Sequence, residues 1–191
     1  MTSTERMIFN NFLIDENHYP EIKALDELMR ELQNETLNEN WGYWHFSLLN
    51  LEEEEDLEKS MHRNLYPIPI YKEHTDFTPG TTDYISMLDL RKLKLEPVSD
   101  LKHEIVSKAE HWSTYQGPTS SPKTSISEKF HDLKYTLANR LVEFLKTKEI
   151  VEVKLAEGLD TYYSFGGDHA GDDLLIKTKA GTYVIHFGFS S

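Results

Sequence analysis

The feature that most restricts the fold of this chain is a long apolar stripe that is followed at once by β-rich sequence. Apolar residues recur at steps of three and four positions from 126 to about 147, which is the pattern of one face of an α-helix. The stripe consists of Ile126, Phe130, Leu133, Leu137, Leu141, Phe144 and Leu145. Either Ser125 or Ser127 can cap the start of this helix. Because the stripe is too short for an isolated coiled coil, we expect the helix to pack on a sheet of the same chain.

The C-terminal residues predict that sheet. Four β-rich runs lie at residues 150–155, 161–165, 173–178 and 182–189, and the short connection Lys179–Gly181 joins the last two. In the last run, one set of alternating positions is aromatic or branched: Tyr183, Ile185, Phe187 and Phe189. Since alternate side chains of a strand point to opposite faces of a sheet, this set lies on one face, and Val184 and His186 lie on the other. The runs together predict a C-terminal β-meander.

Two further helices with clear start signals are predicted before residue 115. Pro20 begins a segment whose apolar residues again fall on one face, and this spacing predicts a helix to about Asn34. Proline suits the first turn of a helix, where its missing N–H costs nothing. Asp100 is a suitable N-cap for a second helix from Leu101 to about Trp112.

The remaining N-terminal segments give weaker patterns. Residues 41–49 are rich in aromatic residues and predict a strand. Its expected core face carries Trp44, Phe46 and Leu48, and its other face carries Tyr43, His45 and Ser47. A short acidic helix is predicted within 52–62, an extended, proline-interrupted connection at 64–80 and another strand at 82–90.

These elements predict one α+β domain over residues 1–191, with an internal linker at 116–125 where glycine, proline and serine concentrate. We expect N-terminal helices and a long amphipathic helix to pack on a mainly antiparallel sheet that ends in the β-meander. No stretch resembles a signal peptide or approaches the roughly 20 apolar residues of a membrane span. A cytoplasmic protein without membrane contact is therefore expected.

The composition excludes several classes of chemistry and binding. The chain has no cysteine, so it has neither disulfides nor cysteine-based metal centres. Its net charge of −13 disfavours direct binding to nucleic acid, whose phosphates attract a basic surface. No phosphate-binding loop, dinucleotide fingerprint or nucleophile elbow occurs. We expect no cofactor and no enzymatic activity.

The negative charge is concentrated in one segment. Residues 15–58 contain 14 acidic residues but only Lys23 and Arg30, whereas residues 101–191 contain 12 acidic and 11 basic residues. One interpretation is a pair of solvated helices. The other is an acidic surface that attracts a basic protein partner and speeds its association. The predicted contact residues are Glu27, Glu31, Glu35, Glu39, Glu52, Glu53, Glu54, Glu55 and Asp56, with Tyr43 as an aromatic anchor.

An alternative site lies in the loop predicted at 166–173, where three glycines, three aspartates and one histidine crowd together. Its acids and imidazoles would suit a divalent metal of a small hydrolase. The candidate ligands are Asp168, His169, Asp172 and His186. The spacing matches neither the calcium-binding loop nor the H-E-x-x-H zinc motif. The favoured interpretation is a hairpin or bulge loop in which Asp172 or Asp168 bonds its own backbone.

The stretch from Phe165 to Leu175, FGGDHAGDDLL, resembles the Gly/Asp loop that enters a strand in the SUKH immunity superfamily. This resemblance covers about 25 residues at the end of the sequence. It departs from the family pattern because that family continues past this strand into further structure, including a helix, whereas this sequence ends at Ser191. It implies an immunity protein that binds and blocks a toxin domain. We therefore expect an inhibitor of a basic, nuclease-like toxin acting in the cytosol. The acidic segment also fits an anti-defence protein that mimics nucleic acid.

Overall fold

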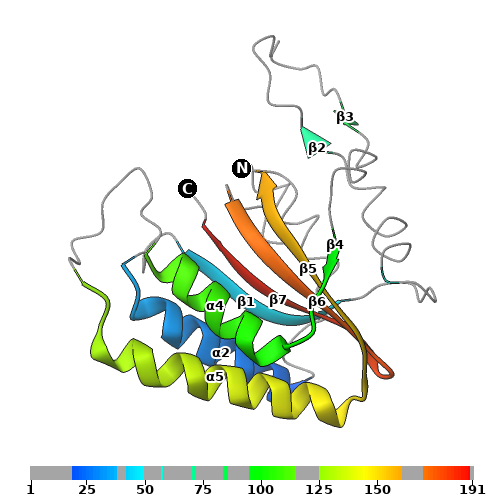
Figure 1. The fold of residues 1–191 in the computed structure, drawn as a ribbon, viewed down its shortest axis with the longest axis horizontal. Coiled ribbons are helices and arrows are strands. Elements are labelled where there is room, and N and C mark those ends of the chain that lie inside the picture. The colour runs from blue at the N-terminus through cyan, green and yellow to red at the C-terminus, as the bar shows by residue number, and fades with distance from the viewer. Residues whose placement is uncertain are drawn as a thin grey trace.

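Three helices cover one face of a five-stranded antiparallel sheet in the computed structural model (Figure 1). The structure describes residues 19–37, 42–49, 57, 70–71, 84–85, 95–114, 125–160 and 170–189. The described helices are α2 (Pro20–Asn34), α4 (Leu101–Ser113) and α5 (Glu128–Thr147). The strands are β1 (Gly42–Leu49), β2 (Ile70–Tyr71), β3 (Tyr84–Ile85), β4 (Leu95–Pro97), β5 (Ile150–Asp160), β6 (Ala170–Thr178) and β7 (Gly181–Phe189).

The order of strands in the sheet is β1-β7-β6-β5-β4, and every neighbouring pair is antiparallel. Strands β5, β6 and β7 follow one another in sequence and in space, which confirms the predicted meander for three of its four runs. Strand β1 lies beside β7 at one edge, although the two are far apart in the chain. The short strands β2 and β3 pair with each other in a separate two-stranded sheet. The predicted α+β fold, with helices on a mainly antiparallel sheet, is thus confirmed.

The helix boundaries follow the capping signals in the sequence. Ser127 begins α5, since its hydroxyl accepts a hydrogen bond from the backbone N–H of Phe130 at 3.3 Å. The carboxylate of Asp100 accepts one from the N–H of His103 at 3.0 Å and begins α4 in the same way. Helix α2 begins with Pro20 and has no side-chain cap.

Two strand boundaries were predicted wrongly by three or more residues. Strand β5 was predicted to end at 155, but it continues to Asp160. The sequence predicted a loop over 166–173, but β6 begins at Ala170. Asp172 and Asp173 are therefore strand residues, and their register partners in β7 are Phe187 and His186. Pairing with strands on both sides satisfies the backbone of β6, so its glycine and aspartates need no turn.

Several predicted segments lie wholly or largely outside the described residues. This holds for the β-rich run at 161–165 and for all but Ser125 of the linker at 116–125. Of the acidic helix predicted at 52–62, the structure describes only Leu57, which is helical and buried. The segments 64–80 and 82–90 are described only where they form β2 and β3.

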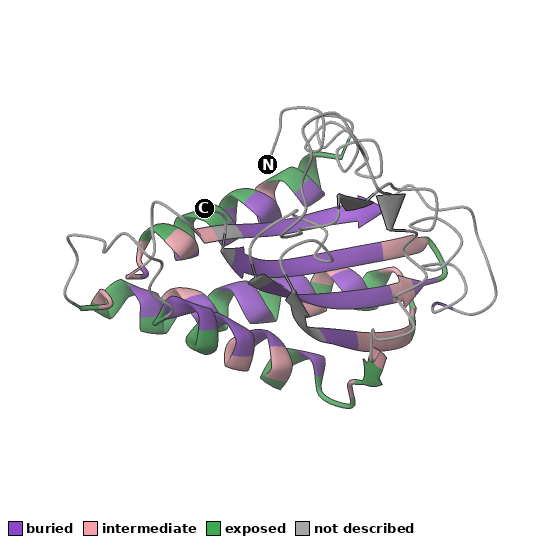
Figure 2. Ribbon diagram, turned by 90° about the horizontal axis from the view of Figure 1, so that it is seen from above, coloured by how far each residue is buried: buried purple, intermediate pink, exposed green. Residues whose placement is uncertain are grey.

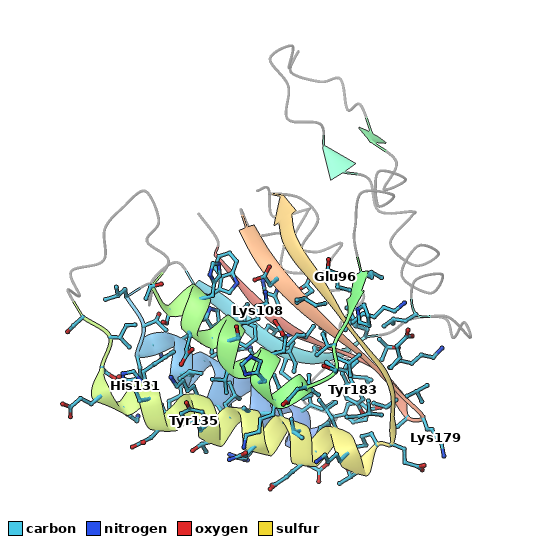
Figure 3. All side chains as sticks on the ribbon, in the orientation of Figure 1. Glu96, Lys108, His131, Tyr135, Lys179 and Tyr183 are labelled. Atoms are coloured by element: carbon cyan, nitrogen blue, oxygen red, sulfur yellow. The ribbon has the colours of Figure 1, made fainter. Side chains whose placement is uncertain are left out.

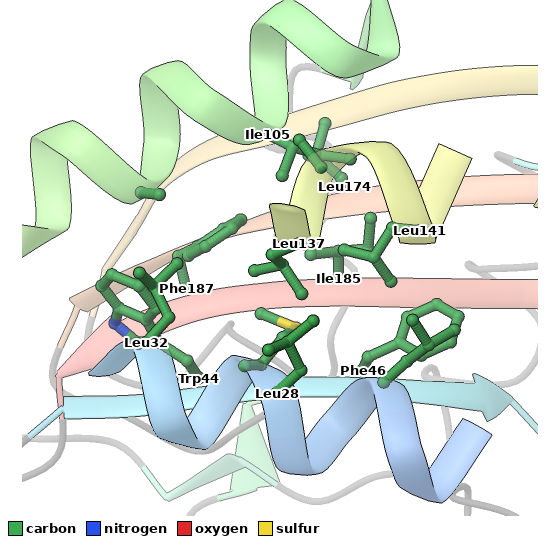
Figure 4. Packing of buried hydrophobic residues seen from close by; sticks show 14 of the residues in the cluster. Leu28, Leu32, Trp44, Phe46, Ile105, Leu137, Leu141, Leu174, Ile185 and Phe187 are labelled. Carbon is green, nitrogen blue, oxygen red and sulfur yellow. The ribbon is translucent and has the colours of Figure 1, made fainter. Parts of the chain in front are cut away.

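The main core lies between the helices and the sheet. It joins the apolar stripes of α2, α4 and α5 to one face of β1, β5, β6 and β7. Figure 4 shows its centre, to which the labelled residues Leu28, Leu32, Trp44, Phe46, Ile105, Leu137, Leu141, Leu174, Ile185 and Phe187 belong. Burying one such side chain completely contributes about 1.5–3 kcal/mol, so this layer is the main source of stability.

The opposite face of the sheet is buried as well. Trp44, Phe46 and Leu48 face the helices as predicted, yet His45 and Ser47 on the other side of β1 are also buried. In the neighbouring strands, Leu175 and Val184 show the same burial away from the helices. Burial along most of each central strand is visible in Figure 2. The expectation that only one face of β1 is core was therefore too narrow.

Helix α2 lies along the free edge of β1. The side-chain carbonyl of Gln33 accepts a hydrogen bond from the N–H of Trp44 at 3.0 Å. One carboxylate oxygen of Asp26 accepts another from the N–H of Phe46 at 2.8 Å. These amides point away from β7, where an edge strand normally leaves its polar groups unpaired. The helix thus supplies two hydrogen-bond acceptors that a sixth strand would otherwise provide.

The β6–β7 hairpin depends on one glycine. A two-residue turn at Lys179 and Ala180 leads into Gly181, whose φ is 142°. A side chain at this position would be strained, and its Cβ would lie 2.9 Å from Cδ1 of Leu48. The turn therefore favours glycine mainly for its backbone conformation, and a larger residue would also have to displace the end of the Leu48 side chain.

Candidate functional site

Helix α2 presents the described part of the predicted acidic surface. Its apolar stripe is fully used in the core, through Ile22, Leu25, Leu28, Met29 and Leu32. Glu27 and Glu31 lie on the opposite face and are exposed, whereas Glu35, directly after the helix, is partly buried. Among the predicted contact residues that the structure describes, folding therefore leaves Glu27 and Glu31 exposed.

A lysine of α5 lies against this surface. The ammonium of Lys129 is 2.6 Å from a carboxylate oxygen of Glu31 and 3.5 Å from one of Glu35. Its hydrogen bond to Glu31 raises the pKa of Lys129 above 10.5. The other oxygen of Glu35 accepts a hydrogen bond from the Ser127 hydroxyl at 2.7 Å, which links the ends of α2 and α5. Glu31 and Glu35 are thus brought together, while Glu27 lies one turn earlier on the helix.

Most of the acidic residues of segment 15–58 are outside the described residues. This applies to Glu39, Glu52, Glu53, Glu54, Glu55 and Asp56. The backbone of Tyr43 is in β1 opposite Gly188, but its side chain is outside the described part. Within Pro20–Asn34 there are four acidic and two basic residues, so α2 accounts for only a small part of the segment's excess charge.

The alternative metal site is not assembled by the described residues. Asp168 and His169 are outside them, and the other two candidate ligands, Asp172 and His186, lie on opposite faces of the sheet. Asp172 contacts α4, whereas His186 alternates with the core residues Ile185 and Phe187 and points the other way. No group of three or more histidine, aspartate or glutamate side chains within the described residues is arranged to hold a metal ion.

Asp172 instead joins α4 to the sheet. One of its carboxylate oxygens accepts a hydrogen bond from Nε1 of Trp112 at 2.8 Å and lies 3.4 Å from the ammonium of Lys108. Figure 3 labels Lys108, which also lies 3.7 Å from Glu104 one turn earlier on α4. The side chains of Trp112, Lys108 and Asp172 are all buried. A buried lysine and aspartate in contact compensate part of each other's desolvation cost, and together with Trp112 they connect α4 to β6.

Two buried aspartate–histidine pairs were not predicted from the sequence. Nδ1 of His186 lies 2.6 Å from Oδ1 of Asp173, and both side chains are at most 1% exposed. Nδ1 of His45 lies 2.6 Å from Oδ1 of Asp26, which also forms an ion pair with Arg30. A carboxylate beside an imidazole fixes the ring and its tautomer, which is how such pairs act in catalytic sites. In this protein both pairs are closed off from solvent.

The sequence contained a signal for one pair and little for the other. Asp26 falls on the apolar stripe of α2, between Leu25 and Met29, where a carboxylate must be buried with a partner. Asp173 and His186 are identified only by the register of β6 and β7, because they are 13 positions apart on neighbouring strands. That register was not available from the alternation of apolar residues alone.

An open groove of about 720 Å³ lies between the first turns of α2 and the last turns of α5. Its lining residues are Pro20, Glu21, Ala24, Leu25, Arg140, Glu143, Phe144, Thr147 and Lys148. The ammonium of Lys148 lies 4.8 Å from the centre of the Phe144 ring and 3.9 Å from Glu21. Two carboxylates and two cations thus line the groove.

No family model, curated protein or solved structure matches this chain. None of the helices in the described part of the chain is both long and apolar enough to cross a membrane. The function must therefore be inferred from the charges and contacts of the chain itself.

Proposed function

We propose that the protein is an inhibitor of the immunity type, which binds a basic protein partner through the acidic residues of segment 15–58. The observation that carries this proposal is the segregation of charge. That segment has 14 acidic and two basic residues, whereas the C-terminal half is nearly neutral. Such a distribution raises the rate at which a basic partner is captured and orients it during the encounter.

The separation between the residues that form the core and the exposed acidic residues supports this proposal. The core is formed by apolar stripes, and the exposed acids Glu27 and Glu31 take no part in it. The ion pair between Glu31 and Lys129 is exposed to water on both sides, since the two side chains are 49% and 54% accessible. Solvent screening makes such a pair weak, so a lysine or arginine of a partner can replace Lys129 at little cost.

The proposed partner is a basic, nuclease-like toxin domain that acts in the cytoplasm. Acids on the inhibitor would pair with the cations that the toxin uses to hold nucleic acid. The resemblance of residues 165–175 to the SUKH immunity superfamily supports the same class of function. Buried aromatic contacts usually supply most of the affinity of such complexes, and Tyr43 in β1 remains the proposed anchor.

The first experiment identifies the partner. A large toxin with a basic C-terminal domain is expected to be encoded beside this chain. Co-expression of the chain should restore the growth of cells that this domain kills, and the two purified proteins should form a stable complex. A neighbouring toxin domain that kills equally well with and without the chain contradicts the proposal.

The second experiment tests the acidic surface itself by measuring association rates with that toxin domain at several salt concentrations. Two variants reverse charge within the segment: E27K/E31K on α2, and the fourfold change of Glu52–Glu55 to lysine. The control D132K/E143K has the same charge change as the α2 variant on exposed positions of α5. Slower association and a weaker salt dependence are expected for the two segment variants. Equal effects in E27K/E31K and the control would show that only net charge matters.

A further inference from the structure

We draw no further inference here: the strongest candidate, the open groove between the first turns of α2 and the last turns of α5, has two carboxylates and two cations in its lining, and nothing in the described structure shows what covers it.

Discussion

His45 and His186 lie directly opposite each other on the antiparallel strands β1 and β7, and each contacts a different buried aspartate. Asp26 reaches His45 from helix α2, whereas Asp173 reaches His186 from the neighbouring strand β6. The two pairs therefore connect three parts of the fold: the helical layer, the edge strand and the centre of the sheet. The contribution of each pair to the stability of the fold can be measured separately.

Removing the carboxylate of Asp26 should destabilise the protein strongly. Asp26→Ala leaves the N–H of Phe46 and the ring of His45 without this acceptor in a buried site, and the expected loss is about 2–4 kcal/mol of unfolding free energy. Asp26→Asn retains an oxygen for the Phe46 amide and should cost less. Urea denaturation measures both. The control Glu27→Ala changes the next, exposed residue and should alter stability by less than about 0.5 kcal/mol. Equal costs at the two positions would show that the Asp26 contacts are unimportant.

The pair of Asp173 and His186 should be energetically coupled. Asp173→Val and His186→Leu each leave one buried polar group without its partner, whereas the double variant removes both. The double variant should therefore be more stable than the sum of the single losses predicts, by about 1–3 kcal/mol. Combining Asp173→Val with Leu137→Ala on α5 supplies the control. Those two changes should add within about 0.5 kcal/mol, and a similar non-additivity there would refute a specific coupling.

The hairpin glycine should be intolerant of substitution. Gly181→Ala places a side chain at a φ of 142° and against Leu48, and the expected cost is about 1–3 kcal/mol. Ala180→Ser at the adjacent exposed turn position should be nearly neutral. Adding Leu48→Ala to Gly181→Ala relieves the contact but not the backbone strain. If thermal unfolding shows that Gly181→Ala is as stable as Ala180→Ser, the turn does not need glycine.

The pKa of the Lys129 ammonium should lie above the ordinary value of lysine. Its hydrogen bond to Glu31 raises the pKa of Lys129 in the folded state. A raised pKa means that the stabilisation is complete below the unfolded-state value of 10.5 and is lost as the pH rises through the folded-state value. The effect on stability is small because the group is exposed. In an NMR titration, Glu31→Gln should return the pKa of Lys129 toward 10.5, whereas Glu27→Gln should leave it unchanged. An unaltered pKa in Glu31→Gln would remove the assigned cause.

The helices were predictable because each is defined by a local pattern. The stripe from Ile126 to Leu145 and the cap at Ser127 belong to one segment, so no knowledge of distant residues is needed. The helix that begins at Pro20 follows the same reasoning. The start of β6 was missed because the Gly/Asp stretch before Leu174 has the composition of a turn, and only pairing with β5 and β7 makes it a strand.

The polar contacts were less predictable because they depend on register. His45 and Ser47 are polar residues that alternate with apolar ones, which is the pattern of a strand with one wet face. Both residues are buried because the second face of the sheet is also shielded from solvent. The alternation of polar and apolar residues along a strand does not indicate whether its polar face is shielded. For the same reason, Asp172 and His186 were grouped as metal ligands. The strand register pairs His186 with Asp173 instead of Asp172, so the two side chains point to opposite faces of the sheet. Their actual partners, Trp112 and Asp173, follow from the packing of α4 and the register of β7.

The hydrogen-bond acceptors that α2 directs at β1 also bear on the tendency of this protein to self-associate through its sheet edge. An open strand edge is a template on which the strand of another molecule can pair, and this is a common route to aggregation. Here Gln33 and Asp26 already occupy the amides of Trp44 and Phe46, so an incoming strand would first have to displace a helix anchored in the core. Protection against edge-to-edge assembly at this side of the sheet is thus built from the same aspartate that stabilises the fold.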